Sequence, residues 1–545
     1  MRKHFLWIGA ALAVVTACGD NLNVANLNNP DVARAYASPA GVEGVVGGLG
    51  SNLNNTQRAS ESINTQAKIL DGEQFATVAN FGMAARSAIP RTPISNDMGN
   101  DQQTGNRANW DSFSRTERSA CVSVAAINAY QAKGQTMGSS AQDARAKAFA
   151  YMIAGEALGY LSLGYDSAAI VTPLTGSSEV PPLSGYKDVN KAALALLDSA
   201  IAVANSAAAA SGSNGFPLPG TWISGRSDLT IANFTRLVRS YKARIRAGVA
   251  RTPAERAAVD WAAVISDATN GITADNNVNI GGSTGWTASF DASQSYVTGG
   301  WHSMGLLMYY GMADVGGGYD AWLKVGMDAR RAFLVVTPDK RWPQGATRAA
   351  QQAEMPTGQS ALPAGRYVRN RSLGEDVATI GWGESWYDHR RYNAVYLNTV
   401  TGPYTDMSKT EIDMLAAEGY IRTGNLAAAA ALIDITRIKN GLPSIGVPAS
   451  ATAPISSAAD CVPRVPQAPS FTSVGCGNIL EAMKYEKRME TSFTGYLVWY
   501  ADSRGWGDLV TGTVVEWAVP YQEMQARFSP SHTSNNMAAK GTYGF

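Results

Sequence analysis

The sequence predicts a mainly α protein: a scaffold of tetratricopeptide-like helix pairs, interrupted by a loop-rich and aromatic-rich region at about 275–404. Two observations support this prediction. Apolar and small residues recur at spacings of three and four along several segments, which is typical of helices that bury one face. Between 275 and 404 this periodicity mostly fails, and glycines alternate with tryptophans and tyrosines. We therefore expect residues 18–545 to form a single composite domain, preceded by a signal peptide at 1–17.

The first 17 residues have the features of a lipoprotein signal peptide. A basic start at 2–4 precedes an apolar run at 5–15, which has the length of a secretory signal core and is too short to span a bilayer. The run ends in Val-Thr-Ala-Cys at 15–18, which resembles the lipobox of bacterial lipoproteins. Cys18 would then be the lipidated first residue of the mature chain. The other interpretation is an ordinary signal peptide with an incidental cysteine.

Helical stripes before the loop-rich region lie at 148–159, 234–245 and 261–265. In the first stripe, Gly155 and Gly159 share the apolar face, so we expect a second helix to approach closely there. The other two stripes are separated by Thr252-Pro253, a break that predicts two helices packed as an antiparallel pair.

The clearest helix pair follows the loop-rich region. One apolar stripe runs along 412–420, a second runs along 426–433, and Gly424-Asn425 lies between them as a turn. Asn440-Gly441-Leu442-Pro443 ends the second helix, since Gly then Pro is a strong stop signal. The small residues and the length of about 34 residues are typical of a tetratricopeptide unit. Such a unit is a scaffold and does not by itself indicate a chemistry.

The aromatics of the loop-rich region divide into core residues and candidate ligand platforms. Most should hold the loops onto the helices, as we expect for Tyr309, Tyr310 and Trp322, which lie in apolar surroundings. A minority could present an exposed ring on which a sugar or another neutral ring stacks. The candidates lie near Gly, Ser, Thr, Asn or Asp, outside clear helical stripes, and one comes from an earlier segment: Trp110, Trp286, Tyr296, Trp301, Trp382 and Trp386.

The composition of the chain, and the absence of several sequence motifs, limit the classes of function that it can have. The chain has 45 Lys+Arg against 44 Asp+Glu, and only 16% of it is charged, which argues against nucleic acid as a partner and suits a neutral polar ligand. It contains no P-loop and no dinucleotide-binding glycine motif. His302, His389 and His532 lie far apart, without HExxH or C-x-x-C. We therefore expect no catalytic residue, no metal and no cofactor.

Two of the remaining cysteines could form a disulfide if the chain is exported. Cys461 and Cys476 flank a Pro/Ser-rich segment, and in an oxidising compartment a disulfide could join its two ends. The sequence leaves open whether they pair. Cys121 stands alone.

Several segments in order resemble the SusD/RagB family of lipid-anchored nutrient-binding proteins. The helix at 144–163, followed by Gly164-Tyr165-Asp166, is similar to a family helix that leads into a Gly-Asp turn. The segments at 28–43 and 234–272 resemble the family's opening segment and its central helix pair. The segment at 336–341 resembles a D-x-R element, and 410–443 resembles the last tetratricopeptide unit.

The helix that carries the family signature is similar but divergent. Glu486, Arg488 and Glu490 match it, and Phe493 and Gly495 follow. At two further signature positions the usual glutamate and arginine are replaced, by Thr494 and Leu497. The resemblance implies that the matching charged residues form buried ion pairs, which hold this helix against the scaffold.

The resemblance implies a function for the whole chain. It predicts a non-enzymatic lipoprotein, anchored in the outer membrane and facing the cell exterior. Such a protein binds a nutrient, most often an oligosaccharide, and passes it to a TonB-dependent outer-membrane transporter of the SusC type. Two other classes stay open: an exported glycan hydrolase, which needs two facing carboxylates, and a helical-repeat adaptor without a small ligand.

Overall fold

The computed structural model describes residues 32–545 apart from 77–82, 101–102, 177, 213–215, 226, 289–301, 305–306, 355–361 and 377–382. Helices dominate it, and the strands are short, which confirms the prediction of a mainly α fold. Helices before the loop-rich region are α2 (Val32–Ala35), α3 (Pro39–Gln57), α4 (Ile63–Leu70), α5 (Met83–Ser87), α6 (Gln103–Ala132), α7 (Ser140–Gly164), α8 (Tyr186–Ser211), α9 (Ile231–Gly248), α10 (Pro253–Ala257) and α11 (Trp261–Thr269). Those that follow are α13 (Leu307–Tyr310), α14 (Gly318–Leu323), α15 (Arg348–Ala353), α16 (Asn393–Leu397), α17 (Lys409–Arg422), α18 (Leu426–Lys439), α19 (Ile479–Thr491), α20 (Val498–Trp506) and α21 (Tyr521–Ala526).

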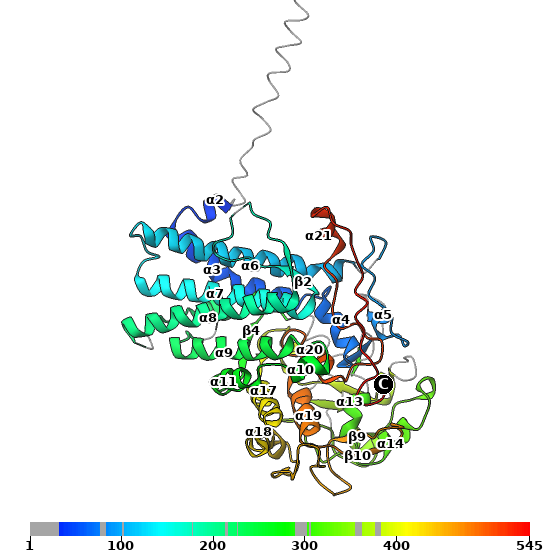
Figure 1. Ribbon diagram of the computed structural model, residues 1–545. Coiled ribbons are helices and arrows are strands. Elements are labelled where there is room, and N and C mark those ends of the chain that lie inside the picture. Colours follow the sequence, from blue (N-terminus) through cyan, green and yellow to red (C-terminus); the bar gives the residue numbers. More distant parts are fainter. Residues whose placement is uncertain are drawn as a thin grey trace, which may run out of the picture.

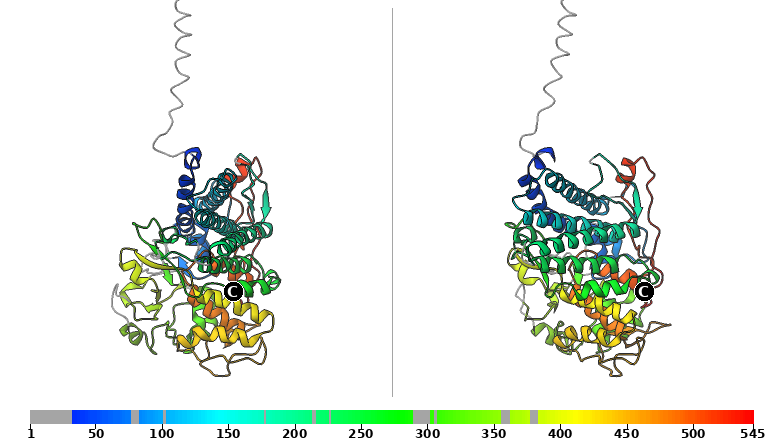
Figure 2. Two further views of the ribbon diagram at one scale, coloured as in Figure 1. Left: turned by 90° about the vertical axis from the view of Figure 1, so that its left-hand side faces the viewer. Right: turned by 60° about the vertical axis from the view of Figure 1, so that its left-hand side comes forward.

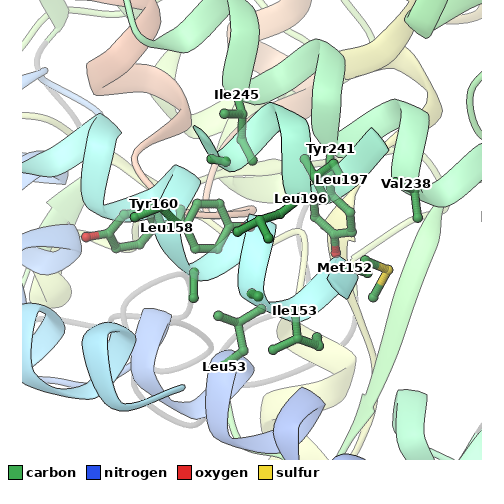
Figure 3. Packing of buried hydrophobic residues seen from close by; sticks show 14 of the residues in the cluster. Leu53, Met152, Ile153, Leu158, Tyr160, Leu196, Leu197, Val238, Tyr241 and Ile245 are labelled. Atoms are coloured by element: carbon green, nitrogen blue, oxygen red, sulfur yellow. The ribbon is translucent and has the colours of Figure 1, made fainter. Parts of the chain in front are cut away.

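The long helices α6 to α9 lie side by side in one half of the molecule (Figure 1). Their close packing depends on glycine, as the sequence predicts. A Cβ on Gly155 of α7 would lie 2.7 Å from Leu197 Cγ of α8, and a Cβ on Gly159 would lie 2.5 Å from Ile245 Cδ1 of α9. Leu158, Tyr160 and the aliphatic residues around them fill the space between these helices (Figure 3).

Helix α8 is long enough, and its mean hydropathy high enough, to cross a membrane. In the folded chain it lies between α7 and α9, and Ala193, Leu197 and Ile201 on its inner face are buried. It is therefore a helix of the bundle that buries one face against α7 and α9.

The second half of the molecule is built on α17, α18 and α19. Helices α17 and α18 pack against each other around the turn that the sequence predicts, in which Gly424 has φ +84°, a left-handed conformation that favours glycine. Asn425 caps α18 by accepting a hydrogen bond from the Ala428 amide. Helix α19 packs on both members of this pair, and α17 also contacts α11, so the two halves share one scaffold.

The strands form antiparallel pairs. The pairs are β1 (Gln74–Ala76) with β5 (His302–Met304), β2 (Ser167–Ala169) with β3 (Leu183–Gly185), β4 (Asn276–Ile280) with β8 (Gly402–Met407), β6 (Val368–Asn370) with β7 (Tyr387–His389), and β9 (Arg464–Pro466) with β10 (Val474–Cys476). In the β4–β8 pair, Val278 lies opposite Tyr404. This pairing brings together the two ends of the segment 281–401, which carries most of the aromatic loops. Cys461 and Cys476 form a disulfide at the base of the β9–β10 excursion, which answers the question that the sequence left open.

Candidate functional site

The structure places two of the sequence-predicted platforms in the core, and for these two the prediction of an exposed ring is wrong. Trp110 is 2% exposed, and its ring meets Tyr165 edge to face with the centroids 5.1 Å apart. It lies on α6, where Tyr165 at the end of α7 covers it. Trp286 is 8% exposed and packs with Val278 and Tyr404, because its loop folds back onto the β4–β8 pair.

The other candidates have different outcomes. Tyr296, Trp301 and Trp382 lie outside the described residues. Trp386 is partly exposed, directly before β7. The prediction that three further aromatics are core residues is confirmed, since Tyr309, Tyr310 and Trp322 are all buried.

Trp386 forms a shelf together with Arg348 and Asp376, which we call the Trp386 shelf. The guanidinium carbon of Arg348 lies 4.6 Å from the centre of the indole ring, a cation–π geometry. Arg348 Nη2 donates to both carboxylate oxygens of Asp376, at 2.7 and 2.8 Å. The Asp376 side chain keeps 35% of its exposure, so acceptor oxygens, guanidinium donors and an aromatic ring share one surface. Such a surface offers a partly exposed aromatic ring together with donors and acceptors for the hydroxyls of a sugar.

Local structure explains why these side chains meet. Thr347 caps α15, so Arg348 is the first helical residue and points toward the β6–β7 pair. Arg348 Nη2 also donates to the Arg371 carbonyl at 3.2 Å, and the Arg371 amide donates to the Trp386 carbonyl at 2.7 Å. Two hydrogen bonds to backbone carbonyls therefore connect the arginine and the tryptophan across 38 residues of sequence.

A buried charge cluster lies beneath the shelf. Asp388, 2% exposed, pairs with three arginines: Arg369 at 2.6 Å, Arg371 at 3.0 Å and Arg390 at 2.9 Å. Arg369 and Arg371 are on β6 or follow it directly, and Asp388 is on β7. The cluster thus ties together the two strands that position Trp386. His389, next to Asp388, is also buried, and burial lowers its pKa to about 3, so this ring stays neutral.

A second buried cluster joins the loop-rich region to the scaffold. Arg341 pairs with Asp339 at 2.7 Å, with Glu486 at 2.9 Å and with Glu490 at 3.0 Å. Glu486 also pairs with Arg437 of α18 at 3.3 Å. Burial raises the pKa of Glu486 to about 7, although both arginines oppose this change.

The rest of the signature helix behaves as the resemblance implies. Arg488 pairs with Asp508 at 2.6 Å, and both side chains are buried. Together with the pairs of Glu486 and Glu490, this confirms that the matching charged residues hold α19 in place. Leu497 and Thr494, the two positions at which the sequence departs from the signature that it resembles, are buried as well.

The structure also shows a wide cleft that sequence reasoning missed. Its volume is about 800 Å³, and it lies between the start of α10, the end of α20 and the segment 535–542. Tyr186 and Phe471 contribute aromatic rings to its wall, and Asn535 and Asn536 contribute amides. No motif marks these residues, because they come from five distant parts of the chain.

Metal and thiol chemistry find little support in the part of the chain that the structure describes. There, no group of three or more His, Cys, Asp or Glu side chains could hold a metal ion. Cys121 is buried, and burial raises the pKa of its thiol, which makes it unreactive.

Comparisons with known proteins identify the fold. No protein-family model matches the sequence, and no curated protein does. A SusD superfamily protein from Bacteroides vulgatus ATCC 8482 matches with a TM-score of 0.52 and 12% identity, over 87% of this chain and 89% of that chain. A SusD superfamily protein from Bacteroides thetaiotaomicron VPI-5482 matches with a TM-score of 0.51 and 12% identity, over 85% and 89%. A SusD homolog from Bacteroides vulgatus ATCC 8482 matches with a TM-score of 0.50 and 12% identity, over 87% and 92%. The chain therefore has the SusD-like fold.

Proposed function

We propose that this chain with a SusD-like fold is a lipid-anchored protein of the outer cell surface that binds an oligosaccharide and passes it to a TonB-dependent outer-membrane transporter. The observation that carries the proposal is the Trp386 shelf. It combines a partly exposed indole, a guanidinium and a carboxylate on the loop-rich side of a SusD-like scaffold. The near balance of 45 basic and 44 acidic residues also suits a neutral ligand.

The shelf favours a sugar for a physical reason. The apolar face of a pyranose ring stacks on an indole, and its hydroxyls need donors and acceptors at the edge of that ring. Arg348 supplies donors and Asp376 supplies acceptors within one ion pair. Because this pair is anchored to the backbone of Arg371, it is ordered before the ligand arrives, which lowers the entropy cost of binding.

A glycan array followed by titration of the best ligand tests this proposal. The mature protein should bind one class of oligosaccharide, and the bound sugar should be recovered intact after long incubation. Release of shorter products that stops when one carboxylate is replaced would instead make the protein a hydrolase. Binding of no sugar at all, together with capture of a protein partner through α17 and α18, would favour the adaptor.

Copurification tests the proposed contact with a transporter. A lid over a barrel mouth should bury an interface in the large class, above about 2,000 Å². We expect the protein to copurify with a TonB-dependent transporter when the two are expressed together. A detergent-solubilised protein that always runs alone under these conditions would contradict the partnership.

A further inference from the structure

Three strongly exposed apolar side chains gather at one end of the molecule. Phe528 is 99% exposed, Leu174 is 94% exposed and Val180 is 69% exposed. From their position we propose that these three loop residues, which we call the apolar tip, insert into the lipid bilayer beside the acyl anchor. The inference rests on the lipid anchor of the proposed function, and it adds a second point of contact that fixes how the protein stands on the membrane.

A hydrogen bond shows that the two segments that carry the apolar tip are in contact, although they are far apart in sequence. Arg527 Nη1 donates to the Pro181 carbonyl at 2.8 Å, so the residues next to Phe528 and Val180 are in contact. Leu174 lies in the same loop as Val180, in a turn where the Gly176 amide donates to Glu179 at 3.0 Å. A single exposed apolar residue needs no explanation, but three on adjoining loops indicate a contact surface.

The apolar tip lies at the end where the described chain begins. Arg118 of α6 donates to the Glu179 carbonyl at 2.9 Å, and the next residue of that helix, Ser119, accepts at 3.2 Å from the hydroxyl of Tyr36. The loop that carries Leu174 and Val180 is therefore close to the residues that follow α2. Figures 1 and 2 show α2 and α21 at the same end of the molecule in all three views, with α18 at the opposite end.

The length of the preceding chain lets the acyl anchor and the tip share one membrane. Fourteen residue steps separate Cys18 from Val32. A chain of this length reaches at most about 50 Å when fully extended. An acylated Cys18 thus keeps this end of the protein near the bilayer, where even a weak apolar contact is favoured by its high local concentration.

Loop tips suit a bilayer better than a protein partner. Leu174 and Val180 belong to a loop, and Phe528 follows the short helix α21, so each side chain stands out from the surface. Protruding apolar side chains beside an acyl anchor can enter the acyl region without a matching shape on the other side. A docked protein would require a complementary pocket for each of them.

Fluorescent labels at the apolar tip test the inference in the full-length lipidated protein. Phe528→Cys and Val180→Cys each introduce one reactive thiol, because Cys461 and Cys476 are bonded and Cys121 is buried. Ile438→Cys and Val447→Cys, at positions 59% and 66% exposed around the far end of α18, are the matched controls. Each variant carries an environment-sensitive dye and is reconstituted into vesicles of phosphatidylethanolamine and phosphatidylglycerol.

We expect emission at the two tip positions to rise several-fold in vesicles, to shift to shorter wavelength and to be quenched by brominated acyl chains. The dye emission at the two control positions should be the same with and without vesicles. The inference is overturned if the emission of the tip labels does not change in vesicles. It is also overturned if that emission changes only when a transporter is present. Sedimentation of the same vesicles separates the two proposals: protein that fails to sediment contradicts the lipid anchor, whereas protein that sediments with its tip labels in water contradicts only the apolar tip.

Discussion

Arg341 of the loop-rich region donates through Nη1 to Oε1 of Glu490 on α19, at 3.0 Å, with both side chains buried. The two residues are 149 positions apart. Arg341 also pairs with Glu486, so one guanidinium connects the loop-rich region to α19. The position of the Trp386 shelf relative to the scaffold depends on this buried charge.

Replacement of Arg341 should therefore destabilise the whole fold. In Arg341→Met, three buried carboxylates lose their shared cation, and loss of one partner of a buried ion pair costs about 3–5 kcal/mol. Chemical denaturation measures the change in unfolding free energy. Arg107→Ala is the control, because the Arg107–Asp111 pair is exposed and should contribute less than about 1 kcal/mol. Equal losses in the two variants would refute the role of the buried cluster.

Alanine variants of two tryptophans should separate an effect on ligand binding from an effect on stability. Each has an arginine over its ring, Arg348 at 4.6 Å from Trp386 and Arg330 at 4.2 Å from Trp322, but only Trp386 is partly exposed. If sugar stacking resembles base stacking, Trp386→Ala should weaken binding by about 1–3 kcal/mol with little change in melting temperature. Trp322→Ala should cost about 3–5 kcal/mol of stability. Titration and thermal melts of both variants check this, and a Trp386→Ala protein that binds normally would remove Trp386 from the site.

Loss of Cys18 should release the protein from the membrane. In the proposed lipid anchor each buried methylene of an acyl chain contributes about 0.8 kcal/mol, and Cys18→Ala would remove all of these chains. Fractionation of cells that lack the transporter should then find the variant in the soluble fraction, with an unchanged melting temperature. Retention in the membrane fraction would show that Cys18 is not the anchor.

Glu156 should make stability depend on pH. Burial, and then the charge of Asp406, raises its pKa from 4.5 to about 8, so the folded chain holds this proton where the unfolded chain has lost it. The resulting stabilisation is complete below pH 4.5 and disappears as the pH rises to about 8, with a slope of at most about 1.4 kcal/mol per pH unit. Glu156→Gln should flatten the unfolding free energy between these values, whereas replacement of the exposed Glu61 by Gln should not. An unchanged slope in Glu156→Gln would contradict the buried proton.

The disulfide should stabilise the excursion that carries β9 and β10. Cys461 and Cys476 close a loop of 15 residues, for which chain entropy predicts about 3 kcal/mol. Thermal melts of the Cys461→Ala/Cys476→Ala variant should show this loss of stability. A reducing agent should cause the same loss in the original chain and in Cys121→Ala. Stability that does not respond to the reductant would mean that the bond contributes nothing.

The sequence was sufficient to locate five of the helices, α7, α9, α11, α17 and α18, because helical periodicity and the Gly and Pro stop signals act over one or two turns. The stripe at 148–159 lies in α7, and the stripes at 412–420 and 426–433 lie in α17 and α18, with Gly424 at the turn. The buried ion pairs of α19 were predicted from the resemblance and not from a local pattern. Local patterns determine the five helices and the turn at Gly424, so a single sequence carries them.

Tertiary structure alone decided which aromatics are exposed. Trp110 and Trp286 have flanking residues as polar as those of Trp386, yet Tyr165, 55 residues from Trp110, and Tyr404, from the far end of the loop-rich region, help to bury them. Arg348 of α15 lies over one face of the Trp386 ring, yet this side chain remains partly exposed. Burial depends on which distant segments pack together, and that arrangement leaves no trace in the residues next to each tryptophan.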